Sequence, residues 1–161
     1  MEFAKKILTA ETLPAWRENL RRQGRKLVVT NGCFDLLHLG HVTYLQQAQQ
    51  QGDALLVGVT SDANVGKLKG PGRPLNTDHD RASVLAALAS VDSVYIFPEL
   101  DARNFLELVK PDIYVKGGDY TVDTINQDER RLLDKLGVKI VILSVVPGKS
   151  TTALLEKINR L

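Results

Sequence analysis

The sequence predicts an α/β protein with a Rossmann-like, five-stranded parallel sheet and helices on both faces of that sheet. Two observations support this prediction. Short apolar runs rich in β-branched residues alternate about five times with segments of helical periodicity, a pattern typical of parallel strands joined by right-handed crossovers. The run over 54–59 is apolar almost throughout, as in a strand that helices cover on both sides. The 161 residues suit a single domain, 1–161, with a substantial core.

Apolar spacing predicts the first element, and the rest follow along the chain. A helix over 9–23 places Leu13, Trp16 and Leu20 on one face, so residues 1–24 are expected to form an N-terminal helical extension. The remaining elements are expected in this order: a strand over 27–30, a helix over 40–50, a strand over 54–59, an irregular stretch over 61–76, a helix after Thr77, a strand over 93–97, a helix over 102–109, a strand over 112–115, a helix over 125–136, a strand over 139–143 and a final helix.

Residue types at the boundaries justify several of these elements. Thr77 is a favourable N-cap, and Asp78 and Asp80 would lie in the first turn of the helix after it. Pro111 blocks continuation of the helix before it. The stretch over 61–76 is rich in glycine, proline and lysine, so we expect a long loop, and long loops in compact domains are often functional.

Composition bounds the possible partners and location. A net charge of +2 gives no strong signal for nucleic acid or for a membrane surface, and we expect neither as a partner. No apolar run approaches the ~18 residues of a membrane span, and the N-terminus lacks a signal-peptide pattern. Cys33 is the single cysteine, so no intramolecular disulfide can form and a reducing, cytoplasmic location is expected.

The stretch over 30–41, Thr-Asn-Gly-Cys-Phe-Asp-Leu-Leu-His-Leu-Gly-His, joins the first long strand to a helix. A helix N-terminus offers unpaired N–H groups and partial positive charge, so anions bind there. Gly40 has no side chain to block a bulky anion, and His38 and His41 flank it, which suggests a phosphate under chemical attack. A zinc site is a competing interpretation, but metal-binding helices usually carry ligands at i and i+4. Cys33 as a nucleophile would need a base beside it.

The carboxyl ends of parallel strands lie on one edge of a sheet. We therefore expect four turns, over 30–41, 60–76, 116–120 and 144–152, to converge there. The end of the last turn, Gly148-Lys149-Ser150, resembles a Walker loop, but the first glycine of that motif would fall at a leucine. Ser150-Thr151-Thr152 can instead cap a helix and hold phosphate oxygens. Each piece also has an ordinary explanation: plain capping, solvated lysines, a flexible glycine turn, or an Arg81 that faces solvent.

Residues 30–41 resemble the first signature of the cytidylyltransferase-like nucleotidyltransferase superfamily, and Ser150-Thr151-Thr152 resembles the second. More narrowly, residues 115–120, and Lys69-Gly70 with Arg73-Pro74, resemble the bacterial D-glycero-β-D-manno-heptose 1-phosphate adenylyltransferases. In many bacteria this enzyme is fused to a sugar kinase, and the resemblance implies a stand-alone form here. The resemblance implies transfer of AMP from ATP to heptose 1-phosphate, giving ADP-heptose and pyrophosphate for lipopolysaccharide core or related glycans. No covalent enzyme intermediate is expected.

The resemblance also implies a role for each candidate residue. The catalytic group comprises His38, His41, Lys69 and Arg81. The nucleotide-binding group comprises Cys33, Phe34, Gly40, Gly117, Asp119, Ser150 and Thr151, and the substrate-binding group comprises Asp35 and Lys67. Either Lys67 or Lys69 would span the α-phosphate and the sugar phosphate. Mg²⁺ would be bridged by phosphates and would need no protein ligand.

Two alternative functions stay open. Related glycerol-3-phosphate cytidylyltransferases carry an arginine five residues before the serine of the second signature, where this chain has Val145, with Lys149 next to Ser150 as a possible substitute. A cytidylyltransferase for glycerol 3-phosphate or another small phosphate or phosphonate is therefore the nearest alternative, and a non-catalytic nucleotide-binding module is the second. Family habit implies a homodimer or higher homo-oligomer.

Overall fold

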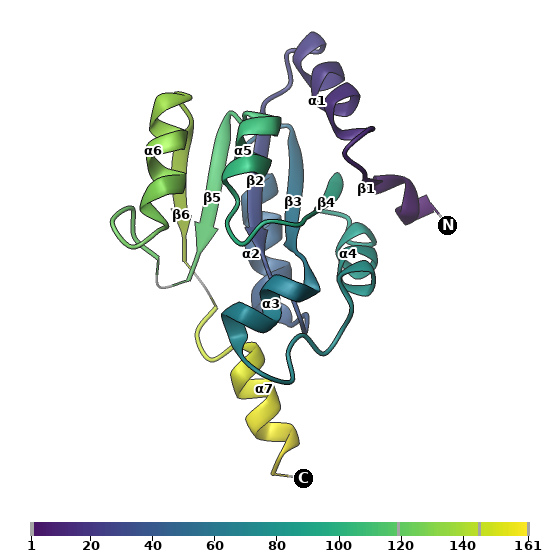
Figure 1. The fold of residues 1–161 in the computed structure, drawn as a ribbon, viewed down its shortest axis with the longest axis vertical. Coiled ribbons are helices and arrows are strands. Elements are labelled where there is room, and N and C mark those ends of the chain that lie inside the picture. Colours follow the sequence, from purple (N-terminus) through teal and green to yellow (C-terminus); the bar gives the residue numbers. More distant parts are fainter. Residues whose placement is uncertain (1, 119, 145, 161) are drawn as a thin grey trace.

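The computed structural model describes residues 2–118, 120–144 and 146–160. Six parallel strands form one sheet in the order β1-β4-β3-β2-β5-β6 (Figure 1). The strands are β1 (Ile7–Leu8), β2 (Leu27–Gly32), β3 (Ala54–Thr60), β4 (Ser93–Phe97), β5 (Ile113–Gly117) and β6 (Lys139–Leu143). The α/β class and the parallel sheet are confirmed, but the count of five strands is one too low. The extra strand, β1, has two residues, too few for a recognisable apolar run, and exists because it pairs with β4 at the sheet edge.

The helices follow the predicted order with two additions, the 3-10 helix at the N-terminus and α3. They are a 3-10 helix (Glu2–Lys6), α1 (Leu13–Arg22), α2 (Leu39–Gln49), α3 (Asp62–Lys69), α4 (Asp78–Ala86), α5 (Arg103–Val109), α6 (Gln127–Lys135) and α7 (Thr151–Ile158). The prediction of a long loop over 61–76 is wrong for its first half, where α3 forms. This helix buries only Asn64 and Val65 and contains Gly66, so it shows no apolar periodicity and has weak helix propensity.

Alternate strand residues face two separate cores. On one face Val29 and Tyr114 pack with side chains of α1, α5 and α6, and on the other Val28 and Val115 pack with side chains of α2 and α4. Figure 1 shows α5 in front of the strands and α2 behind them. Helices on both faces are therefore confirmed. In the described part of the chain, no helix is long and apolar enough to cross a bilayer.

The N-terminal segment is built into this fold. Its strand β1 extends the sheet, and Trp16 of α1 packs against the core that α5 and α6 cover. Arg17 donates hydrogen bonds to the carbonyl oxygens of Val109 and Lys110, both at 2.8 Å, and pairs with Asp112. These bonds tie α1 to the connection between α5 and β5.

The topological switch point lies between β2 and β5, because the chain runs outward from β2 through β3 to β4 and then returns to β5. Recorded pairing between these two strands stops at Val29 and Tyr114, before either strand ends. The Tyr44 hydroxyl of α2 bridges the gap: it donates to the Val115 carbonyl at 3.0 Å and lies 2.7 Å from the Thr30 hydroxyl. The two strand ends therefore part at the point where α/β proteins bind ligands.

Candidate functional site

A cavity of about 760 Å³ lies at the carboxyl edge of the sheet. Side chains from all four turns predicted to converge line it, so that convergence is present in the structure. The predicted site residues that line it are Cys33, Phe34, Asp35, His38, Gly40, His41, Lys69, Gly117, Ser150 and Thr151. Lys67 and Arg81 are not among the lining residues. Asp119 lies outside the residues that the structure describes.

The two histidines sit at the start of α2. His38 is the N-cap residue in an extended conformation, and the backbone N–H groups of His41 and Val42 donate to its carbonyl oxygen. The imidazole rings of His38 and His41 stack with 3.9 Å between their centroids. Both Nδ1 atoms are buried and have no hydrogen-bond partner among the described residues. Buried polar atoms are usually paired, so this pair is arranged for a ligand that brings its own oxygen atoms.

Both histidines are neutral near pH 7. Burial, with a smaller contribution from the neighbouring His38, lowers the pKa of His41 to about 4. Burial also lowers the pKa of His38, with the ammonium of Lys149 adding to the effect. A neutral imidazole has one N–H to donate. The pair therefore offers hydrogen bonds to phosphate oxygens rather than fixed positive charge.

Gly40 is required by its own neighbours. A Cβ at this position would lie 2.9 Å from His38 Nδ1 and 3.2 Å from the Cβ of Lys149. The glycine thus lets the His38 ring and the segment before α7 approach the first turn of α2. Gly40 is expected from the sequence to let an anion approach the backbone, and in the structure it also has this packing role.

We expect Gly40→Ala to lower kcat about tenfold or more with little change in melting temperature, because the added methyl group displaces the His38 ring and small misplacements of catalytic groups are costly. Steady-state pyrophosphate release measures the effect. Gln46→Ala, at an exposed position of the same helix, is the matched control and should retain full activity. Unchanged turnover in Gly40→Ala would contradict the geometry.

The N-terminus of α7 faces the same cavity. Ser150 is its N-cap, and the Ser150 hydroxyl accepts a hydrogen bond from the Ala153 N–H at 3.1 Å. Thr151 donates to the carbonyl oxygen of Leu36, in the turn that precedes α2. The predicted helix cap is confirmed. Two helix N-termini therefore meet at one side of the cavity, with Lys149 between them.

The turn after β2 carries the other predicted nucleotide contacts. Phe34 has a φ of +48°, a backbone conformation that residues other than glycine rarely adopt. Its ring packs edge-on against the ring of His41. Cys33 is a free thiol at the cavity wall. Across the switch point, a Cβ on Gly117 would come within 2.5 Å of the Tyr44 ring, so only glycine fits beside the bridging tyrosine.

Asp35 lines the cavity, but its oxygens are occupied. Oδ2 accepts from the Arg73 guanidinium at 2.7 Å, and Oδ1 accepts from the backbone N–H groups of Leu75 and Asn76. Burial acts to raise the pKa of Asp35, but these bonds outweigh it and lower the pKa. Asp35 therefore anchors the segment after α3 to the turn after β2. This use of its lone pairs argues against the predicted role as the main acceptor for sugar hydroxyls.

Arg81 does not reach the cavity. Its side chain is fully buried, and its guanidinium donates to the carbonyl oxygens of Cys33, Thr60 and Asn76 and pairs with the carboxylate of Asp62. The geometry assigns Arg81 a positioning role in place of the predicted catalytic one. Helix periodicity could not reveal this, because it does not determine what a long side chain reaches.

The two candidate lysines of α3 differ in position. Lys69 lines the cavity, whereas Lys67 does not and its Nζ lies 3.4 Å from Oδ1 of Asn64 on the same helix. Of the two, Lys69 is placed to meet a ligand. Arg73, held by Asp35, also lines the cavity.

Sequence reasoning missed a polar network on the opposite side of the cavity. Lys116 donates to Oδ1 of Asn31 at 2.9 Å, and the Tyr114 hydroxyl donates to the same oxygen at 2.7 Å. Burial lowers the pKa of Lys116, while the carboxylate of Glu129 and the thiol of Cys33 act to raise it. The sequence feature that could have pointed to this network is Lys116 itself, a lysine at the carboxyl end of an otherwise apolar strand.

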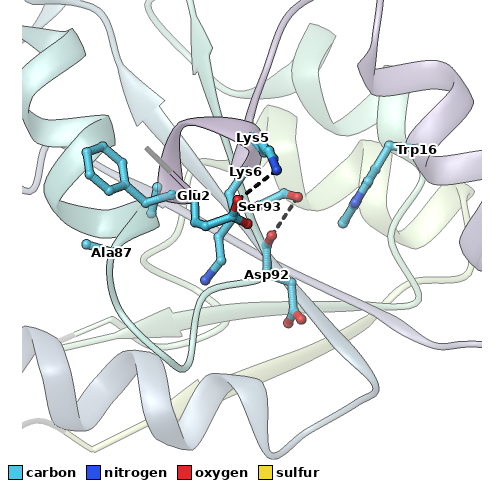
Figure 2. Close-up of a pocket in the computed structure, with 9 residues that line it drawn as sticks. Glu2, Lys5, Lys6, Trp16, Ala87, Asp92 and Ser93 are labelled. Carbon is cyan, nitrogen blue, oxygen red and sulfur yellow. Dashed lines mark hydrogen bonds and ion pairs between the residues drawn. The ribbon is translucent and has the colours of Figure 1, made fainter.

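A second hollow of about 560 Å³ lies against β4 and α4, lined in part by the N-terminal segment (Figure 2). Both of its lysines already have hydrogen-bond acceptors within the protein. Lys5 forms an ion pair with Glu2, and Lys6 donates to the carbonyl oxygens of Leu88 and Val91. None of the predicted site residues that the structure describes lines this hollow, so the carboxyl-edge cavity is the candidate site.

Comparisons with known proteins agree with this location. A family model described as cytidylyltransferase-like matches residues 29–156, which include both helix N-termini. The bifunctional protein HldE of Pseudomonas fluorescens (strain SBW25) is 49% identical over 153 residues, covering 95% of this chain and 32% of that protein. HldE of Syntrophotalea carbinolica is 44% identical over 158 residues, covering 98% and 32%. The chain thus spans about a third of the length of these curated relatives.

Two solved structures are similar. The lipopolysaccharide core biosynthesis protein from Thermoplasma volcanium GSS1 is 30% identical with a TM-score of 0.64, covering 76% of this chain and 98% of that one. The pantoate-beta-alanine ligase from Francisella tularensis, complexed with beta-gamma ATP and beta-alanine, is 15% identical with a TM-score of 0.57, covering 96% and 78%. The second likeness supports the fold alone.

Proposed function

This chain belongs to the cytidylyltransferase-like family, and on that premise we propose that it transfers AMP from ATP to D-glycero-D-manno-heptose 1-phosphate, giving ADP-heptose and pyrophosphate. The observation that carries the proposal is the meeting of two helix N-termini and two stacked, neutral histidines at the switch point of the sheet. The similarity to HldE and to a lipopolysaccharide core biosynthesis protein supports the choice of pathway.

The proposed reaction is an in-line displacement. An oxygen of the sugar phosphate attacks the α-phosphorus of ATP, the bond from that phosphorus to the bridging oxygen breaks, and pyrophosphate leaves with the electron pair. Such a reaction needs positioning and charge stabilisation more than covalent chemistry. His38 and His41 would donate hydrogen bonds to the α- and β-phosphates, and Ser150 and Thr151 would hold the β- and γ-phosphates. Lys69 would contact the reacting phosphates from the end of α3.

The proposed ion is Mg²⁺ carried by the triphosphate. Among the described residues there is no group of three or more histidine, cysteine, aspartate or glutamate side chains that could hold a metal ion. The carboxylates of Asp35 and Glu129 at the cavity wall already accept hydrogen bonds. Phosphate oxygens are ligands that Mg²⁺ prefers, and the ion would neutralise charge that develops on them.

A panel of nucleoside triphosphates tests the reaction. We expect pyrophosphate release with ATP and heptose 1-phosphate, at least about tenfold faster than with CTP. Adenine and cytosine differ in ring size and in hydrogen-bonding groups, and such differences are worth about a factor of ten or more. Glycerol 3-phosphate in place of the sugar phosphate is the control acceptor. Activity with CTP alone would overturn the adenylyl assignment, and binding of ATP without turnover on any acceptor would favour a binding module.

Three further expectations form part of the proposal. Residues 1–161 are one nucleotidyltransferase domain, supported by the integration of β1 and α1 into the sheet and core. The free Cys33 suits a reducing, cytoplasmic location. A homodimer or higher homo-oligomer is supported by α7, which buries none of its residues and exposes Leu154 and Ile158.

A further inference from the structure

Lys116 is a partly buried cation at the switch point, and among the described residues not all of its hydrogen-bond donors have a recorded acceptor. An ammonium group has three donors. In the described part of the chain, its one recorded acceptor is Oδ1 of Asn31, at 2.9 Å, and no carboxylate lies within ion-pair distance. The Nζ atom lies 5.4 Å from the centre of the Tyr114 ring and 5.6 Å from that of Tyr120, and the side chain lines the cavity. A desolvated cation in this position suits an oxyanion.

The surroundings of Lys116 are held in place without a ligand. The single proton of the Tyr114 hydroxyl lies between two acceptors, Oδ1 of Asn31 at 2.7 Å and Oε2 of Glu129 at 3.0 Å. Oε1 of Glu129 accepts from the Ala102 N–H at 2.9 Å, so this carboxylate is fixed at both oxygens. Donors that are fixed before the ligand arrives need no reorganisation when it binds.

The pleat of β5 places Lys116 on a defined face. Tyr114 points into the core covered by α5 and α6, and Val115 points into the core covered by α2 and α4. Side chains two residues apart share a face, so Lys116 lies on the α5 and α6 side with Tyr114. His38 and His41 belong to α2, on the other side, and Lys149 packs against Gly40 of that helix.

In-line displacement connects these two sides to the two substrates. The attacking and leaving oxygens lie on opposite sides of the α-phosphorus. If the N-termini of α2 and α7 hold the leaving pyrophosphate, the acceptor must approach from the side of α5 and α6. We propose that Lys116 binds the phosphate group of the sugar 1-phosphate acceptor on that side, a role that rests on the proposed function.

Lys116→Met tests this proposal, because methionine keeps an unbranched side chain to pack on Tyr114 and removes the charge. We expect the KM for heptose 1-phosphate to rise about tenfold or more, since a charge-assisted bond to phosphate is lost, while the KM for ATP changes less than about twofold. Lys139→Met, at the amino end of the neighbouring strand β6, is the matched control and should leave both constants unchanged. The melting temperature of each variant reports folding.

A binding measurement separates failure of this proposal from failure of the proposed function. Heptose 1-phosphate is titrated by calorimetry into enzyme saturated with α,β-methylene-ATP, which cannot release pyrophosphate. Wild-type binding that Lys116→Met weakens about tenfold supports the role of Lys116 even if turnover with ATP is absent, in which case only the reaction is wrong. Equal binding by both proteins overturns the Lys116 proposal and leaves the reaction standing. Weaker binding of the ATP analogue alone would reassign Lys116 to the nucleotide, and no binding by the wild type would overturn both.

Discussion

His38→Ala and His41→Ala are each expected to lower kcat by about 10²-fold or more, with the KM for ATP changed only modestly. Both imidazoles are neutral, and each would donate a hydrogen bond that strengthens as charge builds on the phosphates. Because the two rings stack at 3.9 Å, loss of one also shifts the other, and the double variant should lose less than the product of the two single effects. Steady-state pyrophosphate release with ATP and heptose 1-phosphate measures all three.

The third histidine supplies the control for this experiment. His79 lies exposed in the first turn of α4 and does not line the cavity, so His79→Ala should keep wild-type turnover. If His38→Ala and His41→Ala both retain full turnover as well, the phosphate-donor mechanism is wrong. A rise in the KM for ATP without loss of kcat would instead assign the pair to ground-state binding.

Arg81→Met is expected to lower the free energy of unfolding by about 3 kcal/mol, because it leaves three carbonyl oxygens without their donor in a buried site. The lost pair with Asp62 adds little, since that carboxylate is 38% exposed and water can solvate it. Urea denaturation followed by circular dichroism measures the change. Arg22→Met, which removes a largely exposed pair with Glu18, is the control and should change stability by less than about 1 kcal/mol.

Measurements of stability and of kcat together distinguish a positioning role of Arg81 from a catalytic one. Unchanged stability combined with a large loss of kcat would show that the guanidinium acts on the phosphates, as the sequence resemblance implied. A loss of stability with the folded enzyme still active would support positioning through the carbonyl oxygen of Cys33 and the end of β3.

The Asp35 and Arg81 contacts together explain how the site is assembled. Asp35 joins the turn after β2 to the segment after α3 through Arg73, Leu75 and Asn76. Arg81 joins the same turn to the end of β3 and the start of α3. Two buried side chains that were expected to touch substrate thus hold the walls of the cavity. In both cases the charged group is paired and hydrogen-bonded inside the protein, which offsets the free-energy cost of removing it from water.

Local sequence patterns predict much of the fold. The apolar run over 54–59 forms a strand that is buried on both faces, and Thr77 caps its helix through the Asp80 N–H as its residue type predicts. The convergence of the turns also follows from pattern alone, because parallel strands present their carboxyl ends on one edge. These features depend on neighbours within a few residues, which is the information that periodicity and caps contain.

The remaining features depend on contacts between distant segments. Strand β1 forms because Ile7 and Leu8 pair with β4, which lies more than eighty residues later in the sequence. The order of strands, which places β5 beside β2 and opens the switch point, also cannot be read from alternation. Arg81 and Lys116 make the same point for the site: one long cationic side chain turns inward to backbone carbonyl oxygens, and the other lines the cavity. A residue type specifies its charge and reach, but packing between helices and sheet decides which oxygen atoms lie within that reach.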